Sequence, residues 1–177
     1  MEKSPFNKIL QTSRLILRPF TISDVHDLFV MDSQAVVHKF LGGHPMREKS
    51  EAMSTITHIV EQYEKNGIGR WAVELKESET FIGWAGLKWE ENVRPGRPYY
   101  DLGYRFHPEF WGQGYATEAA TASIHYAFDQ MQLPAIFAAA DTEHAASNHI
   151  LKKIGFTWKE DFEYEGTACH FYEMKKV

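Results

Sequence analysis

One stretch of the chain, residues 99–119, does most to restrict the folds that this sequence can adopt. It begins as a strand, Tyr99 to Phe106, passes through a loop that contains Gly112 and Gly114, and then opens a long helix. Glycine lets a backbone approach a ligand closely, and a helix N-terminus offers unpaired N–H groups to a phosphate. The stretch therefore indicates an anion-binding loop, with a tight turn that binds no ligand as the alternative.

The sequence around this loop argues against two common phosphate-binding folds. The loop lacks the Gly-Lys-Ser/Thr ending of a P-loop. A dinucleotide-binding fold is disfavoured because the preceding elements indicate an antiparallel meander instead of a βαβ repeat.

Hydrophobic periodicity predicts the other elements. Alternation and short apolar runs predict strands at residues 14–18, 68–76, 80–89, 99–106, 134–140, 156–164 and 168–175. Helical spacing and end signals predict helices at residues 21–32, 53–66, 114–131 and 145–154. The order βααβββαβαββ predicts an α+β fold, in which residues 134–140 lie parallel beside residues 99–106. With 177 residues, we expect a single domain over residues 1–177.

Composition narrows the classes of partner. The chain has 19 Lys and Arg against 24 Asp and Glu, a net charge of −5, which disfavours a general nucleic-acid binder and tolerates a cationic partner. Cys169 is the sole cysteine, so no intrachain disulfide is possible. The nine histidines show no metal-ligand spacing, and we expect no metal. No apolar run is long enough to span a membrane, and we expect a cytoplasmic protein.

Four motifs, in order along nearly the whole chain, resemble those of the GNAT superfamily of N-acetyltransferases. The closer match is to the branch typified by enzymes that acetylate ribosomal-protein N-termini. The motifs are Arg14-Leu-Ile-Leu-Arg-Pro-Phe20, Trp111-Gly-Gln-Gly-Tyr-Ala-Thr-Glu-Ala119, His144-Ala-Ala-Ser147 followed by Asn148, and Lys153-Ile-Gly-Phe156. The resemblance implies a GNAT-like fold, with a mixed central sheet of about seven strands flanked by four helices.

The resemblance also implies acetyl-CoA as donor and CoA as product. Backbone N–H groups of residues 112–117 are then expected to hold the CoA diphosphate. The strand that ends at Phe106 is expected to separate from its parallel neighbour, so that the pantetheine amides fill the gap like an added strand. A backbone N–H near Phe106 is the expected donor to the thioester carbonyl. The implied cofactor-binding residues are Arg105, Phe106, His107, Trp111, Gly112, Gln113, Gly114, Tyr115, Ala116, Thr117, His144, Ser147 and Asn148.

The candidate catalytic residues are Ser147, Asp101 and His107. Leu151 stands where many members of the superfamily have a tyrosine acid, which leaves Ser147 as the nearest hydroxyl; helix capping is its alternative role. Asp101 and His107 are candidates for a base or a water-relay group. The alternatives are an ion pair or cap for Asp101 and a hydrogen bond to the neighbouring loop for His107. His144 also departs from the family, which usually has asparagine there.

The resemblance implies acetyl transfer to a primary amine, and we expect direct attack in a ternary complex, with no acetyl on Cys169. An α-amine titrates near ~7.8 and a lysine amine near ~10.4, so a protein or peptide N-terminus needs less help from a base. The alternatives are a small amine, such as an aminoglycoside, polyamine or amino-acid derivative, and a CoA-binding sensor without turnover. We expect the protein to be a monomer or a homodimer. Arg94 and Arg97 form either an anion clamp or an ordinary surface loop.

Overall fold

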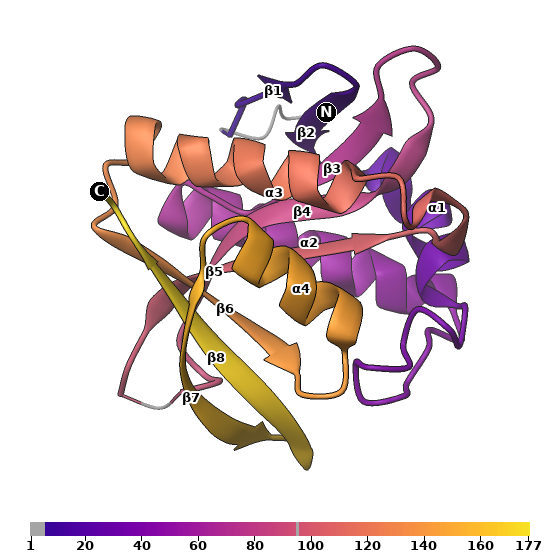
Figure 1. The fold of residues 1–177 in the computed structure, drawn as a ribbon. Helices are drawn as coiled ribbons and strands as arrows, with labels where there is room; N and C mark the ends of the chain where they lie inside the picture. The colour runs from indigo at the N-terminus through magenta and orange to yellow at the C-terminus, as the bar shows by residue number, and fades with distance from the viewer. Residues whose placement is uncertain (1–5, 95) are drawn as a thin grey trace.

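The computed structural model describes residues 6–94 and 96–177. Eight strands form one mixed sheet in the order β1-β2-β3-β4-β5-β6-β8-β7. The strands are β1 (Leu10–Gln11), β2 (Leu15–Pro19), β3 (Arg70–Leu75), β4 (Phe81–Glu90), β5 (Tyr99–Phe106), β6 (Ala135–Asp141), β7 (Thr157–Tyr164) and β8 (Thr167–Lys175). The four α-helices are α1 (Val25–Asp32), α2 (Lys49–Asn66), α3 (Tyr115–His125) and α4 (Ala145–Lys153) (Figure 1).

The predicted α+β class, the four helices and the seven strands are confirmed, with small differences. The eighth strand, β1, is only two residues long and pairs with β2, so it carries no periodicity that a sequence pattern can show. Helix α2 begins at Lys49, earlier than the predicted start at Met53, because Glu48 and Glu51 form a capping box at its N-terminus. The long helix after the glycine loop changes at Tyr126 into one π-helical turn.

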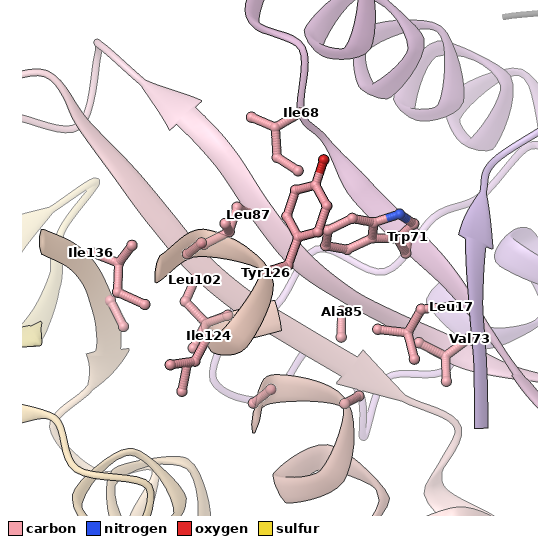
Figure 2. Packing of buried hydrophobic residues seen from close by; sticks show 14 of the residues in the cluster. Leu17, Ile68, Trp71, Val73, Ala85, Leu87, Leu102, Ile124, Tyr126 and Ile136 are labelled. Carbon is pink, nitrogen blue, oxygen red and sulfur yellow. The ribbon is translucent and has the colours of Figure 1, made fainter. Parts of the chain in front are cut away.

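The helices cover opposite faces of the sheet. Figure 1 shows α3 and α4 in front of the sheet and α2 behind it. Leu102 on β5 belongs to the core cluster that α3 covers, which also holds Trp71, Leu87, Ile124 and Ile136 (Figure 2). A second cluster, with Phe20, Leu28 and Ile56, lies beneath α1 and α2. Since strand residues alternate between faces, Asp101, Gly103 and Arg105 lie on the α1–α2 face of β5.

Strands β5 and β6 separate along their length. They run parallel, as predicted, but share one register pair, Asp101 with Phe137. By contrast, β6 pairs with β8 over its full length, from Ala135 to Asp141. Figure 1 shows the ends of β5 and β6 diverging. Beyond Asp101, no strand in the described part of the chain therefore pairs with the edge of β5 that faces β6.

Candidate active site

The glycine loop between β5 and α3 presents unpaired backbone donors. Gly112 and Gly114 have positive φ angles of 72° and 83°, which residues with a Cβ rarely adopt. Among the described residues, the N–H groups of residues 112–117 donate to no acceptor, while Glu118 N–H is the first to bond back, to Gly114 O. The positive end of the α3 dipole adds to these donors. The loop is therefore built to hold an anion.

Arg14 ties this loop to the first long strand. Its Nη1 donates to Gln113 O at 3.0 Å and its Nε to Glu118 Oε2 at 2.7 Å. Its guanidinium also lies 4.3 Å from the centre of the Tyr115 ring. Sequence reasoning assigned Arg14 to a strand motif and missed this contact, because 99 positions separate it from Gln113.

The end of β5 turns a backbone donor toward the gap. His107 N–H donates to Ile82 O on the β4 side at 2.9 Å. Because successive backbone groups of a strand point to opposite edges, Phe106 N–H points toward β6. Phe106 O on the same edge accepts a hydrogen bond from Trp111 Nε1 at 2.8 Å. The predicted oxyanion donor is thus placed on the open edge, beside the loop.

Tyr104 joins β5 to α4 across the same gap. Its hydroxyl lies 3.1 Å from Ser147 Oγ and donates to Ser147 O at 3.3 Å. Burial raises the pKa of Tyr104 to about 12, although the Ser147 contact opposes the rise. The phenol therefore remains protonated at neutral pH. Sequence reasoning treated Tyr104 as a strand residue; its alternation with Asp101 and Gly103 gives its face but not its partner.

The three candidate residues at the start of α4 are His144, Ser147 and Asn148, and they make different contacts. His144 caps the helix, because Ser147 N–H donates to its Nδ1 at 3.5 Å, so capping does not fall to the Ser147 hydroxyl. Burial lowers the pKa of His144, which favours this neutral accepting ring. Asn148 is committed to the fold: its Nδ2 donates to Asp141 O and His144 O, and its Oδ1 accepts from the Tyr172 hydroxyl at 2.6 Å.

Asp101 forms an ion pair on the α1–α2 face. Its carboxylate contacts the Arg70 guanidinium, which also donates to Asp101 O at 2.8 Å. A Cβ added to Gly103 would lie 2.7 Å from Arg70 Nη2, so glycine leaves room for the pair. The structure thus shows the ion pair that sequence reasoning weighed against a catalytic role.

Two further predicted residues point away from the gap. Arg105 lies on the α1–α2 face, where its Nη1 donates to Asp32 Oδ2 at 2.7 Å, so its side chain does not share a face with Phe106. The His107 ring is buried with its Nδ1 3.3 Å from Gln34 Nε2, and burial lowers its pKa. The His107 ring therefore contacts the loop after α1, which is not the neighbouring loop named as its alternative partner.

The described residues contain no group of three or more His, Cys, Asp and Glu side chains placed to hold a metal ion. No helix in the described part of the chain is long and apolar enough to cross a membrane. Cys169 is buried, its Sγ contacts Thr167 O at 3.6 Å, and burial raises its pKa.

An anion-binding loop beside an unpaired strand edge suits a phosphorylated, amide-bearing ligand held in extended form. The family model "Acetyltransferase (GNAT) domain" matches residues 14–157. The chain belongs to this GNAT acetyltransferase family, whose members transfer an acetyl group from acetyl-CoA to an amine, and it is an acyltransferase.

Relatives and solved structures agree with this family. The chain is 34% identical over 149 residues to an uncharacterized N-acetyltransferase, YoaA, of Bacillus subtilis (strain 168), covering 84% of this chain and 82% of YoaA. It is 34% identical over 161 residues to the FsC-acetyl coenzyme A-N(2)-transacetylase of Aspergillus fumigatus, covering 86% of this chain and 66% of that protein. The ribosomal L7/L12 α-N-protein acetyltransferase RimL, solved with coenzyme A, shares the fold with a TM-score of 0.77, 15% identity, and coverage of 95% and 98%.

Proposed function

We propose that this chain moves an acetyl group from acetyl-CoA to the α-amine of a protein or peptide N-terminus, by direct attack in a ternary complex. The observation that carries the proposal is the open edge of β5, which lies between the unpaired N–H groups of residues 112–117 and the Tyr104–Ser147 pair. The A. fumigatus relative, by its name an acetyl coenzyme A-N(2)-transacetylase, supports this donor and a nitrogen acceptor.

The residues at this edge fit acetyl-CoA. The loop N–H groups and the α3 dipole suit a diphosphate, and the unpaired edge of β5 suits the two amides of a pantetheine arm. The Trp111 Nε1–H donates to Phe106 O, which places the Trp111 ring at the end of β5, next to the loop. Acetyl-CoA supplies an acetyl group activated as a thioester. Phe106 N–H is the backbone donor placed to stabilise negative charge on the acetyl oxygen.

We assign the proton for the departing thiolate to Ser147. Its Oγ lies in the first turn of α4, 3.1 Å from the hydroxyl of Tyr104 on β5. Ser147 would donate its hydroxyl proton to the sulfur and regain one from the ammonium formed on the attacking nitrogen, while Tyr104 stays protonated and holds the Ser147 hydroxyl in place. Leu151, in the position of the usual tyrosine acid, is fully buried in the core.

The acceptor is expected to arrive as a free amine. Asp101 is held in its ion pair with Arg70, and the His107 ring is buried against the loop after α1. Neither group is free to deprotonate a strongly basic amine. An α-amine, with a pKa near ~7.8, is substantially neutral at physiological pH, whereas a lysine amine near ~10.4 is not.

A panel of amines with release of the CoA thiol as the readout tests the proposal. Peptides with free N-termini should release thiol in proportion to acetylated product, and their Nα-acetylated counterparts should release none. An aminoglycoside and a polyamine complete the panel. Faster release with either of these would assign the enzyme to small amines. Tight acetyl-CoA binding with no release on any amine would identify a CoA-binding sensor and refute the proposal.

A further inference from the structure

Arg105 on β5 carries hydrogen-bond donors that the protein does not use. Its Nη1 donates to Asp32 Oδ2 at 2.7 Å, and this is the one hydrogen bond that its guanidinium makes within the described part of the chain. Its Nε and Nη2 have no partner among the described residues, yet neither nitrogen is buried, and 21% of the side chain is exposed. Two nitrogens of this guanidinium can therefore donate to a ligand.

A second arginine on the same face shows how a purely structural pair differs. The strand registers place Arg18 on β2 in the row of Arg105, with two strands between them, about 14 Å away. Arg18 also pairs with a buried aspartate, Asp24, but each of its three guanidinium nitrogens donates, to Asp24, Glu74 or Pro19 O. The unused donors of Arg105 are thus not shared by every ion pair on this face.

The Arg105 guanidinium is held in a fixed position. Its Cζ lies 5.1 Å from the ring centre of Trp84, the register partner of Arg105 on β4. Its ion-pair partner Asp32, at the end of α1, is 1% exposed. Because the carboxylate is buried and the guanidinium is not, the group of this pair that a ligand meets is the cation. A preorganised cation of this kind favours a carbonyl or carboxylate oxygen as its partner.

This guanidinium lies close to the proposed reaction centre. Arg105 directly precedes Phe106, whose N–H we assign to the acetyl oxygen. The covalent path from Phe106 N to Arg105 Cζ is about 10 Å long, so the straight distance between these atoms is shorter. Figure 1 shows α3 and α4, which carry the loop end and Ser147, in front of the opposite face of the sheet. The face of Arg105 is therefore left for the acceptor.

A peptide N-terminus fits the span between these two groups. A hydrogen bond of about 3 Å joins Phe106 N to the acetyl oxygen. In a peptide, the first carbonyl oxygen is about 3 Å from the α-amine nitrogen. When the amine attacks the acetyl carbon, its own carbonyl oxygen can therefore reach the Arg105 guanidinium, and no group further along the peptide is needed.

We infer that Arg105 donates to the first carbonyl oxygen of the acceptor, so that the enzyme selects α-amino carbonyl compounds over amines that lack a carbonyl. This inference rests on the proposed function, and it names the chemical group beside the amine that the function leaves open. Arg105 is then a specificity-determining residue. It reads the main chain of the acceptor, so it selects a peptide N-terminus without selecting its sequence.

Matched acceptors test the inference. A tripeptide amide is compared with a counterpart in which a trans-alkene replaces the first peptide bond, which keeps the shape and removes the carbonyl oxygen. Since the two α-amines titrate differently, kcat/KM is expressed per free amine at the assay pH. In the wild type, we expect the peptide to exceed the alkene by about tenfold or more, because a charge-assisted hydrogen bond is lost.

Charge-matched variants test Arg105 itself. Arg105 is the sole hydrogen-bond donor to the Asp32 carboxylate among the described residues, so Arg105→Gln alone leaves a buried charge without a partner. Arg105→Gln combined with Asp32→Asn removes both charges and should lower the peptide-to-alkene ratio to about three or less. Arg105→Lys should keep part of the ratio. Arg18→Gln combined with Asp24→Asn is the matched control and should leave the ratio unchanged.

Two results would overturn the inference. One is an equal kcat/KM for the peptide and the alkene in the wild type. The other is an unchanged ratio in the Arg105→Gln, Asp32→Asn variant, with its fold checked by circular dichroism. Arg105→Lys keeps the test informative if that double variant does not fold, because a ratio equal to that of the wild type in Arg105→Lys would also count against a contact that depends on guanidinium geometry.

Calorimetry separates failure of the Arg105 contact from failure of the proposed function. The Nα-acetylated peptide and alkene, titrated into the protein with CoA present, report binding without turnover. Tighter binding of the acetylated peptide that the Arg105→Gln, Asp32→Asn variant abolishes supports the contact even if no amine releases thiol, in which case only the proposed function fails. Thiol release from the peptide with no difference between the peptide and the alkene, in rate or in binding, would instead retain the function and refute the contact.

Discussion

At the scale of single residues, the site depends on backbone groups that side-chain chemistry does not reveal. The glycine loop offers N–H groups that charge counting overlooks, which explains how a chain of net charge −5 can suit a polyanion. The residues that sequence reasoning named around the loop are adjacent in space. The two residues named on β5 lie differently. The Phe106 N–H points toward the gap and its side chain is in the core, whereas the Arg105 side chain binds Asp32 on the opposite face of the sheet.

The glycine loop yields a matched pair of substitutions. Gly112 and Gly166 have similar positive φ angles, 72° and 79°, and a Cβ at either would meet nothing within 4 Å. Gly112→Glu and Gly166→Glu therefore cost comparable backbone strain, but only the first places a carboxylate in the anion loop. We expect Gly112→Glu to weaken acetyl-CoA binding at least 100-fold by calorimetry, a loss of about 2.7 kcal/mol or more. Equal affinity in the two variants would remove the loop from the binding site.

The Tyr104–Ser147 pair makes a second prediction at this scale. Ser147→Ala should lower kcat by about 10²-fold or more, with KM for acetyl-CoA little changed, because a general acid acts in the transition state. Tyr104→Phe should lower kcat by a smaller factor, because Ser147 keeps its hydroxyl. Stopped-flow detection of the thiol measures both rates. A full rate in Ser147→Ala would leave protonation of the thiolate to water and refute the assignment.

At the scale of elements, pairing rules explain what the sequence could predict. Alternation and turn residues were enough for seven strands and four helices, and a right-handed crossover for the parallel pair. The early end of β5–β6 pairing and the insertion of β8 between β6 and β7 are long-range packing results that no local pattern encodes. For the same reason, the sequence could not predict the partners of Arg14, Tyr104 and Arg94, which lie far from these residues along the chain.

The Arg70–Asp101 ion pair links β3 to β5 across β4. Replacing Asp101 tests whether this residue has a structural or a catalytic role. Arg70 is buried, with 9% of its side chain exposed, so Asp101→Asn leaves a charge without its partner. We expect the free energy of unfolding to fall by about 3 kcal/mol in chemical denaturation. Asp129→Asn, at an exposed position on the π-helical turn, should change stability little. Because Asp101 is held in this ion pair, the pH profile of kcat/KM in folded Asp101→Asn should be unshifted, and a shifted profile would identify Asp101 as a base.

At the scale of the whole molecule, three histidines lie in or against the segment that ends and follows α1: His38 and His107 are buried, and His144 is half-buried. His38 lies beside Asp32, His107 beside Gln34, and His144 at the start of α4 against Phe40. Burial lowers the pKa of each one. The fold therefore holds all three in the neutral form, and protonation opposes folding.

Stability should consequently fall in mild acid. The folded-state pKa values lie below the unfolded value of ~6.5, so the unfolded chain binds more protons between the two and unfolding is favoured as pH falls. The stabilisation is complete above pH ~6.5 and is lost progressively below it. We expect a lower Tm at pH 5.5 than at pH 7.5 by scanning calorimetry. His144→Asn, which keeps a capping side chain, should show a smaller loss. An equal Tm at the two pH values would contradict neutral burial.

Direct transfer of the acetyl group from acetyl-CoA to a peptide α-amine is tested most directly by a single turnover with acetyl-CoA labelled in its acetyl group. Enzyme in excess is mixed with labelled acetyl-CoA and a peptide with a free N-terminus, and the label is followed in quenched samples. Direct transfer predicts that label leaves CoA at the rate at which it appears on the peptide α-amine, with none on the denatured protein. Label that accumulates on the protein, on Cys169 or elsewhere, before it reaches the peptide would contradict the ternary complex.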